Sequence, residues 1–291
     1  MRDRLITSRD NALVKRARAV RDGKRHDLIF VEGVRLCEEA ARARLSIEDV
    51  LYTERLAHDE RGERLLRALS SLCQRTTIVS EQVLASVSDT KTPQGIVVLA
   101  ARPAGIGGWG SGVSKELNQP RTSSPQPLNP NPQPPLLVIM HRINNPANAG
   151  AILRAAEAAG ATGAVTTEGS ADLFSPKALR GAMGSTFRLP LWEGAQFSDA
   201  LAWCAAQGIR TVSTAASSSA RAHTEVDWTK ASALVIGPEG AGLERDEIAA
   251  ADEAVRIPMH APVESLNVAV ATAIILYEAA RQRGFPESGR G

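Results

Sequence analysis

The sequence of 291 residues contains little of several residue types that would mark particular functions. Aromatic residues make up only 4% of it, fewer than proteins that stack single-stranded bases on aromatic rings usually have. The three cysteines, Cys37, Cys73 and Cys204, form no C-x-x-C pair and no cluster with histidine, so we expect neither disulfides nor a metal site. No run reaches the roughly 18 apolar residues of a membrane helix, and the charged first residues are unlike a signal peptide. We therefore expect a cytoplasmic protein.

Charge is unevenly distributed along the chain, although the net charge is only +2. Residues 1–25 hold nine basic and three acidic residues, whereas residues 136–291 hold 13 basic and 16 acidic ones. A basic N-terminal face can neutralise phosphates, but a solvated helix face explains the same pattern. RNA affinity in the second half would have to come from shaped sites or from the first half.

A boundary is visible at residues 102–135, which contain eight of the sixteen prolines together with many Gly, Ser, Asn and Gln residues. Such a stretch buries too little apolar surface to offset its ordering entropy. We predict a flexible linker at 102–135 between a domain at 1–101 and a domain at 136–291.

Both predicted domains alternate strands with helices, which indicates an α/β fold. In the first, strands are expected at 28–32, 47–52, 76–79 and 95–100, and helices at 8–21, 33–43, 60–72 and from residue 80. In the second, strands are expected at 136–140, 164–166, 210–214, 233–236 and 255–257, and helices at 147–159, 175–182, 198–207 and 266–283. Ser8 and Ser265 are the predicted N-caps of the first and last helices. The second set of strands is apolar without alternation, which is typical of a parallel sheet covered on both faces.

Candidate site residues follow the predicted strands of the second domain, where open α/β sheets bind ligands. Asn148 and Arg154 lie at the start of a helix, as a cap and a surface residue or as groups that bind a ribose or phosphate oxygen. Glu239 lies in the glycine-rich segment 237–242, whose spacing fits neither a dinucleotide fingerprint nor a P-loop. That segment is otherwise an ordinary turn. Ser265 is either a simple helix cap or part of a third loop.

Taken in order, these segments resemble the SpoU/TrmH-type RNA ribose 2′-O-methyltransferases of the SPOUT superfamily. The motifs read N-P-A-N-A-G-A-I-L-R-A-A-E-A-A-G (145–160), L-V-I-G-P-E-G-A-G-L (234–243) and I-P-M-H-A-P-V-E-S-L-N-V-A-V-A (257–271). The intermediate segment R-G-A-M-G-S-T-F-R-L-P (180–190) also fits. Many relatives have Asp where this chain has Asn145, which changes the local charge but not the shape of the motif.

The segments V-E-G-V-R-L-C-E-E-A (31–40) and T-P-Q-G-I-V-V-L (92–99) are similar to the accessory RNA-binding domain of the same family. That domain is a small α/β/α unit. The resemblance therefore implies that residues 1–101 bind substrate RNA, with large-subunit ribosomal RNA favoured over tRNA.

The resemblance also implies a trefoil knot in the C-terminal domain, S-adenosylmethionine as the methyl donor, and a homodimer through helices 147–160 and 266–283. Catalytic or substrate-contacting roles are implied for Arg154, Asn148, Glu239, Ser265 and Asn267. Donor contacts are implied for Thr214, Ala215, Ala216, Gly237, Gly240, Ile257, Met259, Leu266 and Asn267.

Three alternatives are kept beside an rRNA ribose methyltransferase: a tRNA 2′-O-methyltransferase, a superfamily member that methylates a base, and a non-catalytic RNA-binding protein with the same fold. A small-molecule nucleotide enzyme is disfavoured by the missing fingerprints. Arg154 is the family's activator of the hydroxyl, yet a guanidinium with a pKa above about 12 is a poor proton acceptor. We therefore expect Arg154 to position the substrate and to stabilise charge.

Overall fold

The computed structural model describes residues 5–73, 75–103, 133–217 and 219–285. Most of the linker predicted at 102–135 therefore lies outside the described residues. The described residues fall into two compact units. The first unit comprises the described residues of Met1–Ala104, Asn145–Arg154 and Ala171–Arg188. The second unit comprises the described residues of Gly105–Asn144, Ala155–Ser170 and Leu189–Gly291.

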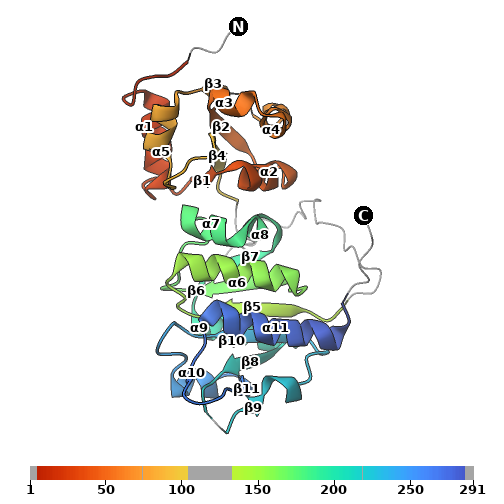
Figure 1. Ribbon diagram of the computed structural model, residues 1–291. Helices are drawn as coiled ribbons and strands as arrows, with labels where there is room; N and C mark the ends of the chain where they lie inside the picture. Colours follow the sequence, from red (N-terminus) through yellow and green to blue (C-terminus); the bar gives the residue numbers. More distant parts are fainter. Residues whose placement is uncertain (1–4, 74, 104–132, 218, 286–291) are drawn as a thin grey trace, which may run out of the picture. The chain divides into compact units, whose positions relative to one another are not determined.

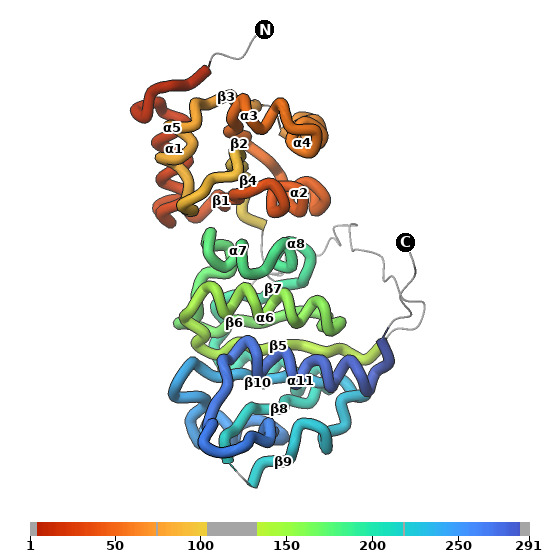
Figure 2. Tube along the Cα trace, viewed as in Figure 1, coloured from red at the N-terminus to blue at the C-terminus, as the bar shows by residue number. Residues whose placement is uncertain are grey.

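A four-stranded mixed sheet forms the centre of residues 5–103, with the order β1-β4-β2-β3 (Figures 1 and 2). Its strands are β1 (Leu28–Glu32), β2 (Ile47–Tyr52), β3 (Thr76–Ile78) and β4 (Ile96–Ala101). Strand β4 runs antiparallel to β1 and β2, whereas β2 and β3 are parallel. The helices are α1 (Ala12–Arg21), α2 (Val34–Arg42), α3 (Glu54–Ala57), α4 (Glu60–Ser70) and α5 (Glu81–Val87).

The small sheet is covered on both faces, which confirms an α/β/α arrangement. On one face, α1 and α5 pack on the sheet through a buried cluster that includes Val14, Val83 and the strand residue Phe30. Helix α2 packs on β1, β4 and α4 and covers the other face together with α4. The alternation of side chains along the strands lets each face bury its own apolar set.

A seven-stranded parallel sheet forms the second half of the chain, in the order β7-β6-β5-β10-β8-β11-β9. Its strands are β5 (Leu136–Met140), β6 (Gly163–Thr167), β7 (Leu191–Ala195), β8 (Arg210–Thr214), β9 (Arg221–Ala222), β10 (Ser232–Ile236) and β11 (Glu253–Arg256). The helices are α6 (Pro146–Ala158), α7 (Pro176–Ala182), α8 (Ser185–Arg188), α9 (Phe197–Ala206), the 3₁₀ helix η1 (His223–Glu225), α10 (Arg245–Ala249) and α11 (Val268–Arg283).

The central strands β5 and β10 are buried along their whole length, as their unbroken apolar sequences predict. Helix α9 packs on one face of the sheet through Cys204 and Ala200, and α11 crosses the sheet in the foreground of Figure 1. Across the part of the chain that the structure covers, no helix is both long and apolar enough to pass through a bilayer.

Two predicted caps are wrong. Helix α1 begins at Ala12 and is capped by Asn11, whose side chain accepts a hydrogen bond from the Leu13 amide, while Ser8 closes a turn with Asp10. Helix α11 is capped by Asn267, not Ser265. Serine and asparagine cap helices about equally well, so the sequence offered two suitable residues at each of these ends.

Several short elements were missed: β7, α3, α8, β9 and α10. Each has five residues or fewer, too few to show a hydrophobic period. The last predicted strand also ends one residue early, at Arg256, so that Ile257 belongs to the following loop.

Candidate active site

Three loops meet at the carboxyl edge of the parallel sheet because they follow neighbouring strands. They leave β8 after Thr214, β10 after Ile236 and β11 after Arg256. Together they enclose a cavity of about 380 Å³. It is lined by Thr214 to Ser217, Ala241 to Leu243, Val255 to Ile257, Met259 and Glu264 to Leu266, and by Ile248, Ala271 and Ile275 of the neighbouring helices. This is the position at which open α/β sheets bind their ligands.

The wall that follows β10 is shaped by a close backbone contact at Gly237. A Cβ atom added there would lie 2.5 Å from the Leu243 amide nitrogen and 2.7 Å from the Gly242 carbonyl carbon. Only glycine allows the turn to fold back this tightly. Gly240 and Gly242 both have positive φ, at 83° and 68°, which glycine adopts without strain. Gly237 thus fixes Gly242 and Leu243 where they line the cavity.

The loop that follows β11 contributes apolar side chains that are open to solvent. Met259 is 40% exposed and Leu266 is 37% exposed, although both are large and apolar. The loop is anchored at its end by Asn267, whose side-chain oxygen accepts hydrogen bonds from the amides of Ala269 and Val270. Capping α11 in this way fixes where Ser265 and Leu266 enter the cavity wall.

The structure brings together most of the residues predicted to contact the donor. Those that line the cavity are Thr214, Ala215, Ala216, Ile257, Met259 and Leu266. Ser265, which was predicted to contact the substrate, lines the cavity as well. Three predicted donor residues belong to the same loops but do not line the cavity. Gly237 makes the close backbone contact, Gly240 has a positive φ in the same turn, and Asn267 caps α11. Glu239 is exposed on the β10 loop.

Asn148 and Arg154 lie on α6, which follows β5. Helix α6 starts at Pro146, and Asn145 accepts a hydrogen bond from the Ala147 amide, so Asn145 rather than Asn148 closes the first turn. Asn148 is partly buried and Arg154 is exposed. The N-terminal half of α6 packs closely against α7 at Gly150 and Gly181. A Cβ atom at Gly150 would collide with the carbonyl oxygen of Ala178.

A polar cluster that the sequence did not indicate joins the end of β5 to α10. His141 is buried between Glu247, at 2.9 Å from its Nε2 atom, and the hydroxyl of Thr167, at 2.9 Å from its Nδ1 atom. Arg142 also pairs with Glu247 and has a positive φ of 52°. The cluster fixes the first residues of the loop between β5 and α6.

Glu247 keeps its charge in this cluster. Burial raises the pKa of its carboxyl, but the Glu244 amide, His141 and Arg142 together lower the pKa below its ordinary value. No sequence motif marks these residues, because His141 and Glu247 are 106 positions apart. Only the fold brings them together.

The cavity fits the methyl donor expected from the sequence. Its volume lies within the roughly 300–1,000 Å³ of small-molecule sites. The apolar side chains of Ile257, Met259 and Leu266 suit a purine ring, and the Glu264 carboxylate on the same wall suits a cationic group. S-adenosylmethionine carries both features, a purine and positively charged sulfonium and ammonium groups.

Comparison with known proteins identifies the family. Residues 135–277 match the SpoU rRNA Methylase family, and residues 11–98 match an MRM3-like substrate binding domain. The 23S rRNA (guanosine-2′-O-)-methyltransferase RlmB of Coxiella burnetii is 30% identical over 81% of this chain and 88% of its own length. The chain belongs to the SpoU rRNA methylase family.

Two further relatives agree with this assignment. The 23S rRNA (guanosine(2553)-2′-O)-methyltransferase RlmP of Bacillus subtilis is 27% identical over 90% of this chain and 92% of its own length. The crystal structure of an AdoMet-bound rRNA methyltransferase from Sinorhizobium meliloti superposes with a TM-score of 0.76 and 27% identity. It covers 96% of this chain and 97% of that chain.

These relatives confirm four expectations from the sequence: the family, an α/β fold with a parallel sheet, S-adenosylmethionine as the donor, and RNA 2′-O-methylation as the class of reaction.

Proposed function

We propose that this SpoU-family enzyme methylates a ribose 2′-hydroxyl of large-subunit ribosomal RNA, using residues of α6 and of the loops after β8, β10 and β11. The observation that carries the proposal is the cavity of about 380 Å³ whose walls are formed by two of the three family motifs. RlmB and RlmP, which match most of the chain, are both named for 23S rRNA.

When bound, S-adenosylmethionine supplies an electrophilic methyl group on a positively charged sulfur. The chain's own task is to hold a weakly acidic ribose hydroxyl in line with that methyl group and to exclude other orientations. Fixing two reactants in such a geometry can contribute roughly 7–11 kcal/mol of the barrier. Ile257, Met259 and Leu266 hold the adenosine part, and the backbone that Gly237 fixes holds the rest.

Arg154 is the proposed substrate-positioning residue. It is exposed on α6, where a planar guanidinium can donate two parallel hydrogen bonds to a phosphate or ribose oxygen. Its positive charge stabilises the negative charge that develops on the 2′-oxygen as the hydroxyl proton passes to solvent water. A guanidinium does not readily release a proton, so Arg154 is not assigned the role of general base.

The other motif residues take supporting roles in this proposal. Asn148 contacts the substrate from the first turns of α6, and Glu239 from the loop after β10. Ser265 lines the cavity and contacts the reacting groups, whereas Asn267 fixes the position of Ser265 by capping α11. We also assign the trefoil knot of the family to the segment that carries these motifs.

The proposed division of labour follows the predicted domains. Residues 1–101 bind RNA, residues 136–291 perform the transfer, and residues 102–135 link these two domains. The enzyme acts in the cytoplasm.

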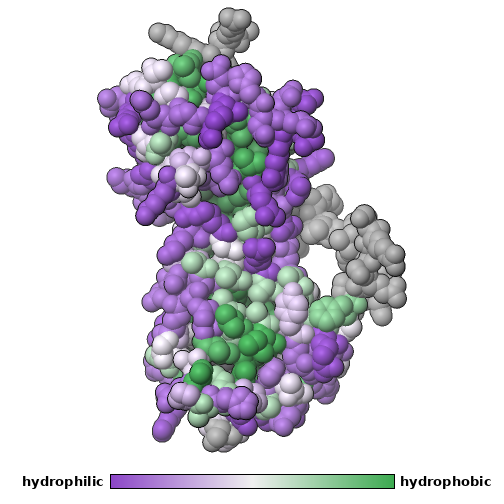
Figure 3. All heavy atoms as spheres, viewed as in Figure 1, coloured by the Kyte–Doolittle hydropathy of each residue, from purple (hydrophilic) through white to green (hydrophobic). Residues whose placement is uncertain are grey.

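We further propose a homodimer through α6 and α11. Its support is the exposed apolar side chains of α11, where Val270 is 49% and Tyr277 is 46% exposed, within an apolar patch that Figure 3 shows over this helix. Sedimentation of the full chain tests it, and a monomer at micromolar concentration would refute it.

The function is tested by incubating the purified chain and labelled S-adenosylmethionine with separate pools of unmodified rRNA and tRNA. Nucleoside mass spectrometry then identifies the product. The proposal predicts a 2′-O-methylnucleoside in the rRNA pool. The same product in tRNA alone would overturn the substrate, and a methylated base would overturn the reaction.

A further inference from the structure

Two arginines of the basic N-terminal segment, which the sequence suggested as a phosphate-binding face, are engaged in contacts within the fold. Arg21 donates hydrogen bonds from its Nη1 atom to the carbonyl oxygens of Ser86, Val87 and Ser88 at the end of α5. Arg18 bonds the Ser86 carbonyl and hydroxyl. These guanidiniums stabilise a helix C-terminus, where cations are favoured. Arg18 and Arg21 are therefore committed to the fold, which directs attention to the other basic surfaces of this domain.

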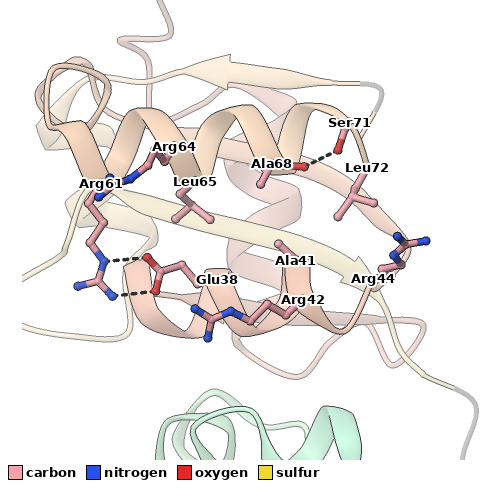
Figure 4. A pocket seen from close by; sticks show the side chains of 10 residues that line it. All are labelled: Glu38, Ala41, Arg42, Arg44, Arg61, Arg64, Leu65, Ala68, Ser71 and Leu72. Carbon is pink, nitrogen blue, oxygen red and sulfur yellow. Dashed lines mark hydrogen bonds and ion pairs between the residues drawn. The ribbon is translucent and has the colours of Figure 1, made fainter. Parts of the chain in front are cut away.

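A groove between α2 and α4 is lined by a second set of arginines, and Figure 4 shows its lining residues. It encloses about 750 Å³. Arg42 and Arg44 come from the end of α2 and the turn that follows it, and Arg61 and Arg64 come from the opposite wall, α4. Its apolar floor includes Leu65.

The lining of this groove is positive because it contains four arginines and a single acid, Glu38. Both oxygens of Glu38 accept hydrogen bonds of 2.7 Å from Arg61, which lower the pKa of the carboxyl. Glu38 is thus ionised at neutral pH, so the lining residues taken alone carry a formal excess of three positive charges. Glu39 and Glu60, which lie outside the lining, pair with Arg42 and Arg64.

The remaining arginines are available for a ligand. The side chain of Arg42 is 70% exposed and pairs with Glu39, and that of Arg64 is 63% exposed and pairs with Glu60. Ion pairs this exposed contribute little free energy, so a phosphate can replace the carboxylate at small cost. Arg44 is exposed at the end of α2 and has a positive φ of 51°.

From these observations we infer that the groove between α2 and α4 is a docking surface for the phosphate backbone of the substrate RNA, with Arg42, Arg44 and Arg64 as its phosphate ligands. The inference rests on the proposed function and adds to it the face of the N-terminal domain that meets RNA. Two facing walls of guanidiniums suit a polyanion that runs along the groove, because each guanidinium can bind a phosphate with two hydrogen bonds.

The composition of the groove favours contacts to phosphates over the reading of bases. The ten residues that line it include no aromatic side chain on which a base could stack. Its floor consists of small or aliphatic side chains, such as Ala41 and Leu65. Binding through the groove should therefore depend on salt and depend little on sequence.

The positive surface extends beyond the groove through Arg61. This residue also lines a neighbouring hollow of about 530 Å³, together with Arg35 and Arg55. Asp59 is the acid on that hollow's lining. An RNA backbone that runs along the groove would therefore meet further arginines where the groove ends near α3. A positive surface of this length suits a polyanion better than a small anion.

The test uses the full chain with Arg42→Gln, Arg44→Asn and Arg64→Gln combined. Asparagine is chosen at residue 44 because it tolerates positive φ. The matched control combines Lys15→Gln, Lys24→Gln and Arg25→Gln, which removes three exposed charges from the α1 region. Binding of a labelled RNA duplex and of an unmodified 23S rRNA transcript is measured between about 50 and 200 mM salt. Thermal midpoints and S-adenosylmethionine affinity are measured for every protein.

The groove variant should bind both RNAs on the order of 10–100-fold more weakly, with a salt slope reduced by roughly one per arginine, and with unchanged donor affinity and thermal midpoint. The control should bind as the wild type does. Unchanged RNA binding by the groove variant, or an equal loss in the control, would overturn the groove and leave the proposed function intact. Failure of the wild type to bind any RNA, despite donor binding, would overturn both.

Discussion

Replacing Gly237 by alanine tests how tightly the donor cavity is constructed. The new methyl group would lie 2.5 Å from the Leu243 nitrogen, 2.7 Å from the Gly242 carbonyl carbon and 2.8 Å from the Leu243 Cγ atom. Two of these atoms are backbone, so a change of rotamer cannot relieve the overlap. The turn that lines the cavity must itself move by roughly 1 Å to restore ordinary van der Waals contact.

Overpacking of this kind costs about 1–3 kcal/mol. Since the displaced residues belong to the cavity wall, we expect the cost to appear largely in the binding of S-adenosylmethionine. At about 1.4 kcal/mol for each tenfold change, the dissociation constant should rise roughly 5- to 150-fold. Isothermal titration calorimetry measures this directly, and a thermal unfolding curve measures any loss of fold stability.

Gly240→Ala in the same turn separates the steric effect from backbone strain. Gly240 has a φ of 83° and nothing within 4 Å of an added Cβ atom, so alanine there meets strain but no overlap. Strain of this type costs about 1–2 kcal/mol. We expect a loss of stability with a smaller loss of donor affinity. If Gly237→Ala bound the donor as tightly as the wild type with an unchanged thermal midpoint, the account of this wall would be wrong.

Three further predictions concern stability and reactivity. Glu247→Gln should lower the free energy of unfolding at pH 7 by on the order of 1–3 kcal/mol in urea titrations. Folding lowers the pKa of this carboxyl. Its contribution to the stability of the fold is therefore present above the ordinary glutamate pKa and is lost as the pH falls through the pKa of the folded state. A stability difference between Glu247→Gln and the wild type that persists unchanged at pH 3 would contradict this. Arg21→Ala should lower the free energy of unfolding by about 1–3 kcal/mol, because the carbonyl groups at the end of α5 lose their donor. Arg21→Lys should recover only part of this stability, and RNA affinity should be unchanged in both variants. A thermal midpoint equal to that of the wild type would refute the capping role. Burial raises the pKa of Cys204 to about 11 and also raises that of Cys73. A thiol reagent at pH 8 should therefore label the folded chain slowly and the unfolded chain completely; rapid labelling of Cys204 in the folded chain would be inconsistent with its burial.

Much of the fold could be predicted because its strands are long apolar runs. The ranges expected for β1, β2, β5 and β8 agree with the structure to the residue. Helix ends were less certain, since Ser8 and Asn11, or Ser265 and Asn267, are equally good caps and only tertiary packing selects between them. Short elements such as α10 carry no period from which they could be recognised.

The candidate site could be predicted where residues lie close in sequence within a motif. The loop residues around Thr214, Ile257 and Leu266 meet as expected because parallel strands place their carboxyl ends at one edge. The buried contact between His141 and Glu247 could not be predicted, since it depends on two loops whose distance is set by the fold. Two contacts of the basic N-terminal segment could not be predicted for a related reason. Arg18 and Arg21 find carbonyl partners on α5, 65 or more positions away.

In the proposed mechanism, Arg154 positions a ribose 2′-hydroxyl for transfer from a donor held in the cavity. The most direct test is single-turnover methylation of unmodified 23S rRNA by the wild type, Arg154→Ala and Arg154→Lys, with the 2′-O-methylnucleoside quantified by mass spectrometry. Donor affinity is measured in parallel. We predict that Arg154→Ala loses at least roughly 100-fold in rate, that Arg154→Lys recovers only a fraction of it, and that donor affinity is unchanged in both. A wild-type rate of 2′-O-methylation in Arg154→Ala would contradict this role of Arg154.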